Sequence, residues 1–228
     1  MSVFPKQNEV INAVLTGIKT AKGNFTNWTT QELFLSETIS KFLTVHISQE
    51  IAKIKNTPEI FMDATVADIL RCSLPQKNEF KQFMEKKNMK NDSFSLTLDE
   101  RFEHKSEDDS ISRVVISVNH VVGNTKPEYI NSIDTMCKII DRKNQKDSTL
   151  DYGIIALYLD ISNTARKKSE SRLKDILDAF DSVILSRKNL KSYYKGISIN
   201  KIENVGEWCM GCYIVEPVFD QYFKEVKG

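Results

Sequence analysis

The chain has 228 residues, with 32 basic and 31 acidic side chains and a net charge of +1. This balance excludes a global field that draws the whole protein to nucleic acid or membrane, although a local basic patch remains open. Hydrophobic residues make up 40% of the chain, and no apolar run is long enough to cross a bilayer. Four cysteines and an N-terminus without a signal-peptide pattern favour a reducing, cytoplasmic setting with no membrane partner.

The first part of the chain, residues 1–56, is predicted to be helical. Apolar residues recur at helical spacing from Val10 to Ile18, and Gly23 predicts the end of that helix. Residues 29–32, Thr-Thr-Gln-Glu, are typical of an N-terminal cap. The apolar stripe that follows, from Ile39 to Ile54, predicts a second amphipathic helix.

The middle part, residues 57–160, is expected to form most of a central sheet. Short strands are predicted at residues 60–62 and 94–98, with a helix at 64–72 and a charged, solvated helix or loop from Lys77 to Asn91. The run Arg113–Val122 is apolar on both faces, which is typical of a buried central strand. Its alternation places Ser117 and Asn119 on one face.

A second core strand is predicted at residues 151–159, after a helix that begins near Pro127. Strand, helix and strand in this order favour a parallel crossover. The last part, residues 161–228, is expected to hold a long helix capped by Ser162-Asn163 and two strands that form a hairpin near Gly206. With no linker or repeat, the sequence predicts a single α/β domain over residues 1–228, with a central mixed sheet flanked by helices.

This order of elements resembles the core of the PD-(D/E)XK nuclease superfamily, the restriction-endonuclease-like fold. The resemblance covers residues 28–159. It rests on Phe42-Leu-Thr-Val-His-Ile-Ser-Gln-Glu-Ile51, Arg101-Phe-Glu-His104, the strand and turn from Val114 to Lys126, and the Tyr152-Gly-Ile-Ile-Ala-Leu-Tyr158 strand. It implies a Mg²⁺-dependent endonuclease ancestry, with metal-binding acids and a lysine on the central strand.

In that family the central strand carries an acid, any residue and then lysine, and the matching positions here are Ser117, Val118 and Asn119. Neither a hydroxyl nor an amide replaces the carboxylate that Mg²⁺ prefers. Lys126 follows the strand after a glycine turn, where it restores the missing lysine only if the backbone folds back. The resemblance therefore implies a degenerate site and an inactive relative that holds no metal or other cofactor.

A rival alignment keeps the enzyme active. Glu103-His104-Lys105 also reads as acid-x-lysine, with Asp63 or Asp99 as the upstream acid, and would make the chain a Mg²⁺-dependent DNA endonuclease. The flanks of this segment lack the apolar character of a core strand. A solvated edge strand explains the same residues without any chemistry.

Two other motifs have structural and functional interpretations. Cys209-Met-Gly-Cys212 has the CxxC spacing, and its position in a predicted strand favours two reduced core cysteines over a zinc or redox site. A basic cluster at the start of the last long helix opposes the helix dipole, so it suits either an anionic partner such as DNA or a solvated face. Its members are Arg166, Lys167, Lys168 and Arg172.

Three functional hypotheses follow. The first is a nuclease-like protein with an eroded metal site that binds nucleic acid or a protein partner, in a restriction or phage-defence system. The second is an active nuclease that uses Asp63, Glu103 and Lys105. The third is a protein-interaction or homodimerisation domain that does not contact nucleic acid.

Overall fold

The computed structural model describes residues 4–33, 39–101, 110–121 and 126–219. Six α-helices lie in these ranges: α1 (Gln7–Thr29), α2 (Ile39–Ile51), α3 (Val66–Ser73), α4 (Phe80–Lys86), α5 (Pro127–Ile140) and α6 (Ser169–Leu185). Two short 3-10 helices accompany them, η1 (Lys77–Glu79) and η3 (Gln145–Asp147). The strands are β1 (Glu59–Thr65), β2 (Ser93–Asp99), β3 (Ser112–Val121), β4 (Tyr152–Ser162), β5 (Leu190–Gly196), β6 (Asn200–Ile202) and β7 (Gly206–Pro217). Within these ranges, no helix is both long and apolar enough to cross a bilayer.

One mixed sheet organises the fold, in the order β1-β2-β3-β4-β7-β5, with β6 paired to β7. Strands β1, β2 and β3 form an antiparallel meander, and β4 then runs parallel to β3. Because α5 connects β3 to β4, the predicted parallel crossover is confirmed. Strand β7 returns antiparallel to β4, so the two longest strands lie at the centre of the sheet.

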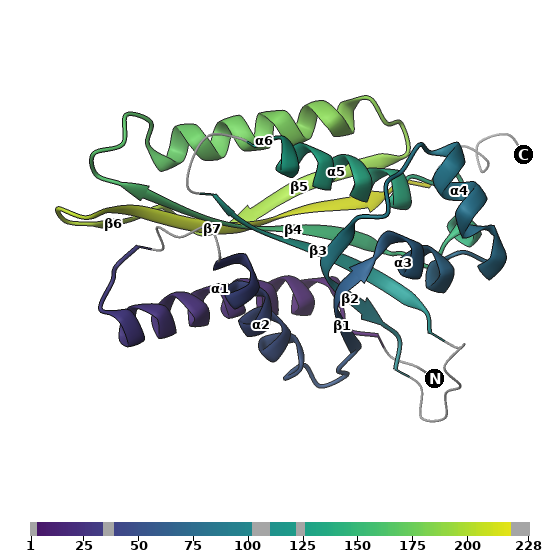
Figure 1. Cartoon of the computed structure of the whole chain (residues 1–228), viewed down its shortest axis with the longest axis horizontal. Helices are drawn as coiled ribbons and strands as arrows, with labels where there is room; N and C mark the ends of the chain where they lie inside the picture. Colours follow the sequence, from purple (N-terminus) through teal and green to yellow (C-terminus); the bar gives the residue numbers. More distant parts are fainter. Residues whose placement is uncertain (1–3, 34–38, 102–109, 122–125, 220–228) are drawn as a thin grey trace, which may run out of the picture.

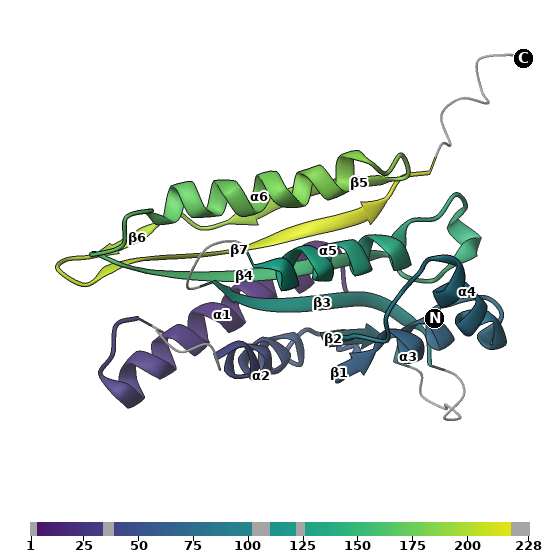
Figure 2. The same ribbon diagram turned by 45° about the horizontal axis from the view of Figure 1, so that its top comes forward.

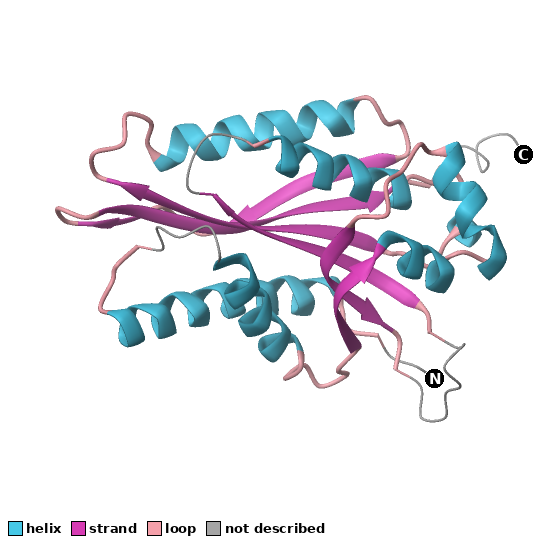
Figure 3. Cartoon of the chain, in the orientation of Figure 1, coloured by secondary structure: helices cyan, strands magenta, loops and turns pink. Residues whose placement is uncertain are grey.

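Helices cover both faces of this sheet, as the prediction of an α/β fold with a flanked mixed sheet required (Figures 1 and 3). The first core packs α1 and α2 on the face that includes Val114, Ile116 and Val118. The second core packs α3, α5 and α6 on the face that includes Val115. Figure 2 shows α5 and α6 on the side of the sheet opposite α1 and α2. Strand β4 is buried on both faces from Tyr152 to Ile161, which explains its continuous apolar sequence.

Three predicted boundaries were wrong. Helix α1 continues through Gly23 to Thr29, because Thr30 adopts the left-handed conformation and its N–H donates to the carbonyl of Thr26 at 2.9 Å. The residues expected to cap the second helix therefore end the first. Helix α6 begins at Ser169 rather than after Asn163, because β4 extends as far as Ser162.

The C-terminal strands differ from the sequence prediction in one respect. The segment expected to be one strand up to Ile202 is divided into β5 and β6, and both pair with β7. The expected hairpin near Gly206 is confirmed, since β6 and β7 pair directly with Ile202 opposite Gly206. Asn204 takes a positive φ of 60° in the turn, which asparagine tolerates better than most residues.

Candidate functional site

The centre of β3 carries the polar pair that the sequence singled out. Ser117 is 8% exposed, and its hydroxyl lies 2.7 Å from the hydroxyl of Ser132 on α5. The Asn119 amide donates to the same Ser117 oxygen at 3.4 Å. The structure thus satisfies both side chains locally, as buried polar groups require. Lys126 lies beyond the undescribed residues 122–125, where it forms the N-cap position of α5.

A small groove adjoins this polar pair. It has a volume of about 240 Å³ and is bounded by the start of β2 and one side of α5. Ser132 lines it together with two acids, Asp92 just before β2 and Glu128 in the first turn of α5. Sequence reasoning missed all three residues, since only the fold brings the start of β2 beside α5. Asp92 lies two residues before the predicted strand at 94–98, which is the one sequence signal near it.

Two acids of the rival alignment, the alternative upstream acids, line a second pocket. Asp63 on β1 and Asp99 at the end of β2 both line a cavity of about 380 Å³ beneath α3. Asp99 is 2% exposed, whereas Asp63 is exposed and has a positive φ of 53°. Thr97, also 2% exposed, lines the same cavity, and its hydroxyl has no hydrogen-bond partner in the described part of the chain. The pocket therefore combines apolar side chains with a buried carboxylate and a buried, unsatisfied hydroxyl.

The remaining residues of that alignment, Glu103 and Lys105, lie outside the described residues. Among the residues that the structure does describe, no three histidine, cysteine or acidic side chains are grouped as a metal site requires. Asp63 and Asp99 do not share one Mg²⁺ ion, because Glu59 pairs with Asp99 and Asp63 therefore lies four residues further along the strands.

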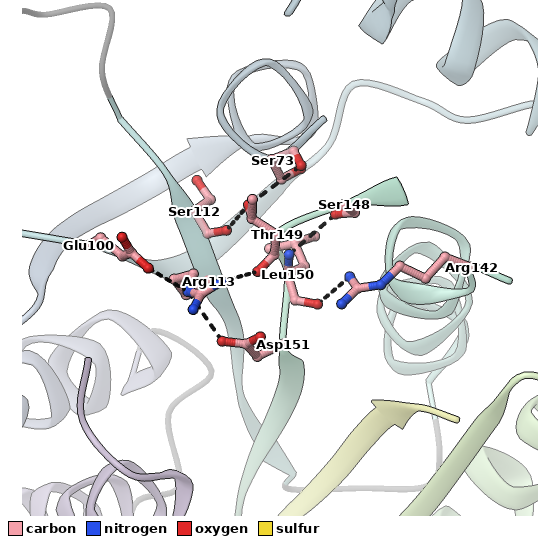
Figure 4. Close-up of polar contacts among 9 residues, drawn as sticks. All are labelled: Ser73, Glu100, Ser112, Arg113, Arg142, Ser148, Thr149, Leu150 and Asp151. Atoms are coloured by element: carbon pink, nitrogen blue, oxygen red, sulfur yellow. Dashed lines mark hydrogen bonds and ion pairs between the residues drawn. The ribbon is translucent and has the colours of Figure 1, made fainter. Parts of the chain in front are cut away.

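A polar network holds the wall of the second pocket in place (Figure 4). The Arg113 guanidinium lies 3.0 Å from Glu100 and 3.3 Å from Asp151, so it joins the end of β2 to the start of β4. Burial raises the pKa of Asp151, and the Arg113 charge opposes that shift. Because both carboxylates already have this partner, the network positions the strands and does not hold an open site.

The same network ties the end of α3 to the sheet. Thr149 donates its backbone N–H to the carbonyl of Ser73 at 2.9 Å and its hydroxyl to the carbonyl of Ser112 at 2.7 Å. Arg142, which is 7% exposed, donates to the carbonyl of Leu150. The Thr149 contacts tie the C-terminal end of α3 to the start of β3, whose Ser112 lines the pocket that contains Asp99.

His120 belongs to the opposite face of β3, as the strand alternation predicts. Its Nε2 lies 3.6 Å from Asp160 Oδ2, and the Tyr158 hydroxyl donates to Asp160 Oδ1 at 2.9 Å. The side chains of His120 and Asp160 are fully buried, and the ring of Tyr158 stacks on Trp208. This cluster is closed to solvent, so it acts as a polar part of the core and not as a reactive site. The register of β3 against β4, which the sequence did not reveal, creates it.

The CxxC cysteines lie on β7 and face opposite sides of the sheet. Cys209 packs in the second core and Cys212 in the first. Burial raises the pKa of each thiol to about 12, so both stay protonated at neutral pH. Two thiols on opposite faces cannot bind one metal ion or form a disulfide with each other. The interpretation of the pair as reduced core cysteines agrees with this geometry.

The basic cluster before α6 is largely engaged within the chain. Lys167 pairs with Asp175, and Lys168 donates to the carbonyl of Asn163 at 2.8 Å. Arg172 donates to the carbonyl of Lys167 at 3.0 Å. Arg166 is exposed on the turn that precedes the helix. Much of this positive charge therefore stabilises the turn itself, and the contacts provide a structural role for the cluster.

Comparisons with family models, with curated proteins and with solved structures found no match to this chain.

Proposed function

We propose that this protein is a nuclease-like α/β domain with a non-catalytic centre, which acts by binding nucleic acid or a protein partner in a restriction or phage-defence system. The order α2, β1, β2, β3, α5, β4 supports this proposal, because it combines an antiparallel meander with a parallel crossover. The same order carries the resemblance to the restriction-endonuclease-like fold.

One observation carries the proposal further. In the proposed alignment Ser117 and Asn119 match the positions of the family's acid and lysine. The Asn119 amide donates a hydrogen bond to the Ser117 hydroxyl, which is itself hydrogen-bonded to the Ser132 hydroxyl. A hydroxyl and an amide that satisfy one another do not supply the charges that bind Mg²⁺ and orient water. DNA cleavage is therefore not the function that this centre supports.

The test is incubation of the protein with supercoiled plasmid and either Mg²⁺ or Mn²⁺, alongside a binding measurement on labelled DNA in chelator. We expect the plasmid to remain supercoiled while the labelled DNA is bound. Metal-dependent nicking that disappears in Glu103→Ala contradicts the proposal. Glu170→Ala, which changes an exposed acid in the first turn of α6, is the matched control.

A second candidate function is an active Mg²⁺-dependent endonuclease. The specific observation in its favour is that Asp63 and Asp99, the alternatives for the upstream acid of the rival alignment, both line one pocket. If this function is correct, Asp99→Asn abolishes metal-dependent cutting, whereas Asp92→Asn in the separate groove beside Ser132 leaves it intact. Absence of cutting in the unmodified protein rejects this candidate.

A further inference from the structure

The segment inserted between β1 and β2 presents a basic, exposed surface. It contains η1 and α4, and it adjoins η3, because Gln82 and Lys86 line one groove together with Asp147. Residues 77–90 and 143–147 together contain seven lysines and three acids, a net charge of +4 against +1 for the whole chain. We call this the α4 surface; its lysines are Lys77, Lys81, Lys86, Lys87, Lys90, Lys143 and Lys146.

The lysines of the α4 surface point to an external anionic partner. All of them are exposed except Lys87, which is half-buried. None has an ion-pair partner among the residues that the structure describes. The basic cluster before α6 differs, since three of its four members contact Asp175 or backbone carbonyls. Unpaired positive charge of this density repels itself, and phosphates relieve that repulsion.

The aromatic residues of α4 indicate which anionic partner fits. Phe80 and Phe83 are half-buried and pack on the second core, so they do not project as stacking platforms. Arg71 lies over the Phe80 ring at 5.0 Å, and Lys87 lies over the Phe83 ring at 5.6 Å. Single-stranded nucleic acid is usually held by stacking bases on open rings, and membrane surfaces are held by inserted apolar side chains. The α4 surface provides neither, and it offers charge alone.

We propose that the α4 surface binds the phosphate backbone of double-stranded DNA without reading its sequence. This inference rests on the proposed function, and it assigns the contact to α4 and η3 and not to the start of α6. Figures 1 and 2 place these two basic regions at opposite ends of the molecule, so substitutions separate their contributions cleanly.

The experiment measures binding of the full chain to a short fluorescent DNA duplex in chelator over a range of salt concentrations. The α4 variant replaces three exposed lysines by glutamine, and the control variant does the same on α1 and α2 and just after α2. The α4 variant is Lys77→Gln, Lys81→Gln and Lys86→Gln; the control variant is Lys19→Gln, Lys41→Gln and Lys55→Gln, all exposed in the structure. Both variants lose the same charge.

We expect the α4 variant to bind at least ~10-fold more weakly at moderate salt, and its log–log salt slope to fall by up to about 3, because each lost phosphate contact removes ~0.9. The control variant should keep the slope of the unmodified protein. Thermal unfolding followed by circular dichroism checks that both variants remain folded.

Three results overturn the inference, and they are distinguishable. Loss of binding in Arg166→Gln/Lys168→Gln, with the α4 variant unaffected, moves the contact to α6 and leaves the proposed function intact. Tighter binding to single-stranded DNA, to RNA or to anionic phosphatidylserine vesicles than to the DNA duplex rejects the duplex as the partner. No binding to any nucleic acid at low salt removes both this inference and a nucleic-acid role for the protein, and leaves a protein partner.

Discussion

The hydrogen bond between Ser117 and Ser132 provides a direct test of whether the centre of β3 is structural. Ser117 is 8% exposed, and its hydroxyl has Ser132 at 2.7 Å and Asn119 at 3.4 Å. Removing one hydroxyl leaves its partner unsatisfied or dependent on water, whereas removing both eliminates that penalty. We expect Ser117→Ala and Ser132→Ala each to lower the free energy of unfolding by ~1 kcal/mol. The double substitution should cost ~1 kcal/mol rather than ~2, a coupling of ~1 kcal/mol.

Urea unfolding of the four proteins measures this coupling, since the midpoints shift while the slopes stay equal. Ser182→Ala is the control, because Ser182 is exposed on α6 and its hydroxyl donates only to the carbonyl of Asp178. That change should alter stability by less than about 0.5 kcal/mol. Additive effects of the two central substitutions, with no measurable coupling, refute the view that these residues satisfy one another.

Two further predictions concern the buried thiols. Burial raises the pKa of Cys137, Cys209 and Cys212 to about 12 from 9.0, so above pH 9 the unfolded chain releases protons that the folded chain retains. The free energy of unfolding should therefore fall as the pH rises from 9 toward 12, by ~1.4 kcal/mol per thiol at about pH 10. Urea titrations of Cys212→Ala should show a weaker dependence of that free energy on pH. A thiol reagent should label the half-buried Cys72 first, and rapid labelling of the β7 cysteines in the native protein contradicts the burial of β7.

Strands β3 and β4 were predictable from the sequence because both are buried on both faces. Continuous apolar runs identify β3 and β4, and the helix between them requires a parallel crossover. The helix boundaries were less predictable. Gly23 lies inside α1 because the packing of Ile18 and Ala21 against the core offsets the ~1 kcal/mol that a helical glycine costs.

The candidate sites were less predictable because they depend on register and on contacts between distant segments. Alternation placed Ser117 and Asn119 on one face, but no pattern revealed that Ser132 lies opposite them. The pocket lined by Asp63 and Asp99 depends on the placement of α3, whose C-terminal end the Thr149 contacts tie to the start of β3. The charge and the exposure of the segment from Lys77 to Asn91 were predicted from the sequence, but its apposition to η3 was not.

Titration with Mn²⁺, followed by the electron paramagnetic resonance signal of the free ion, tests most directly the proposal that the β3 centre is non-catalytic and binds no metal ion. We predict that the protein leaves the signal of the free ion unchanged at micromolar Mn²⁺, since neither the Ser117 hydroxyl nor the Asn119 amide supplies the carboxylate that such an ion prefers. A single stoichiometric Mn²⁺ site that disappears in Asp99→Asn or Glu103→Ala contradicts the account and restores the active nuclease.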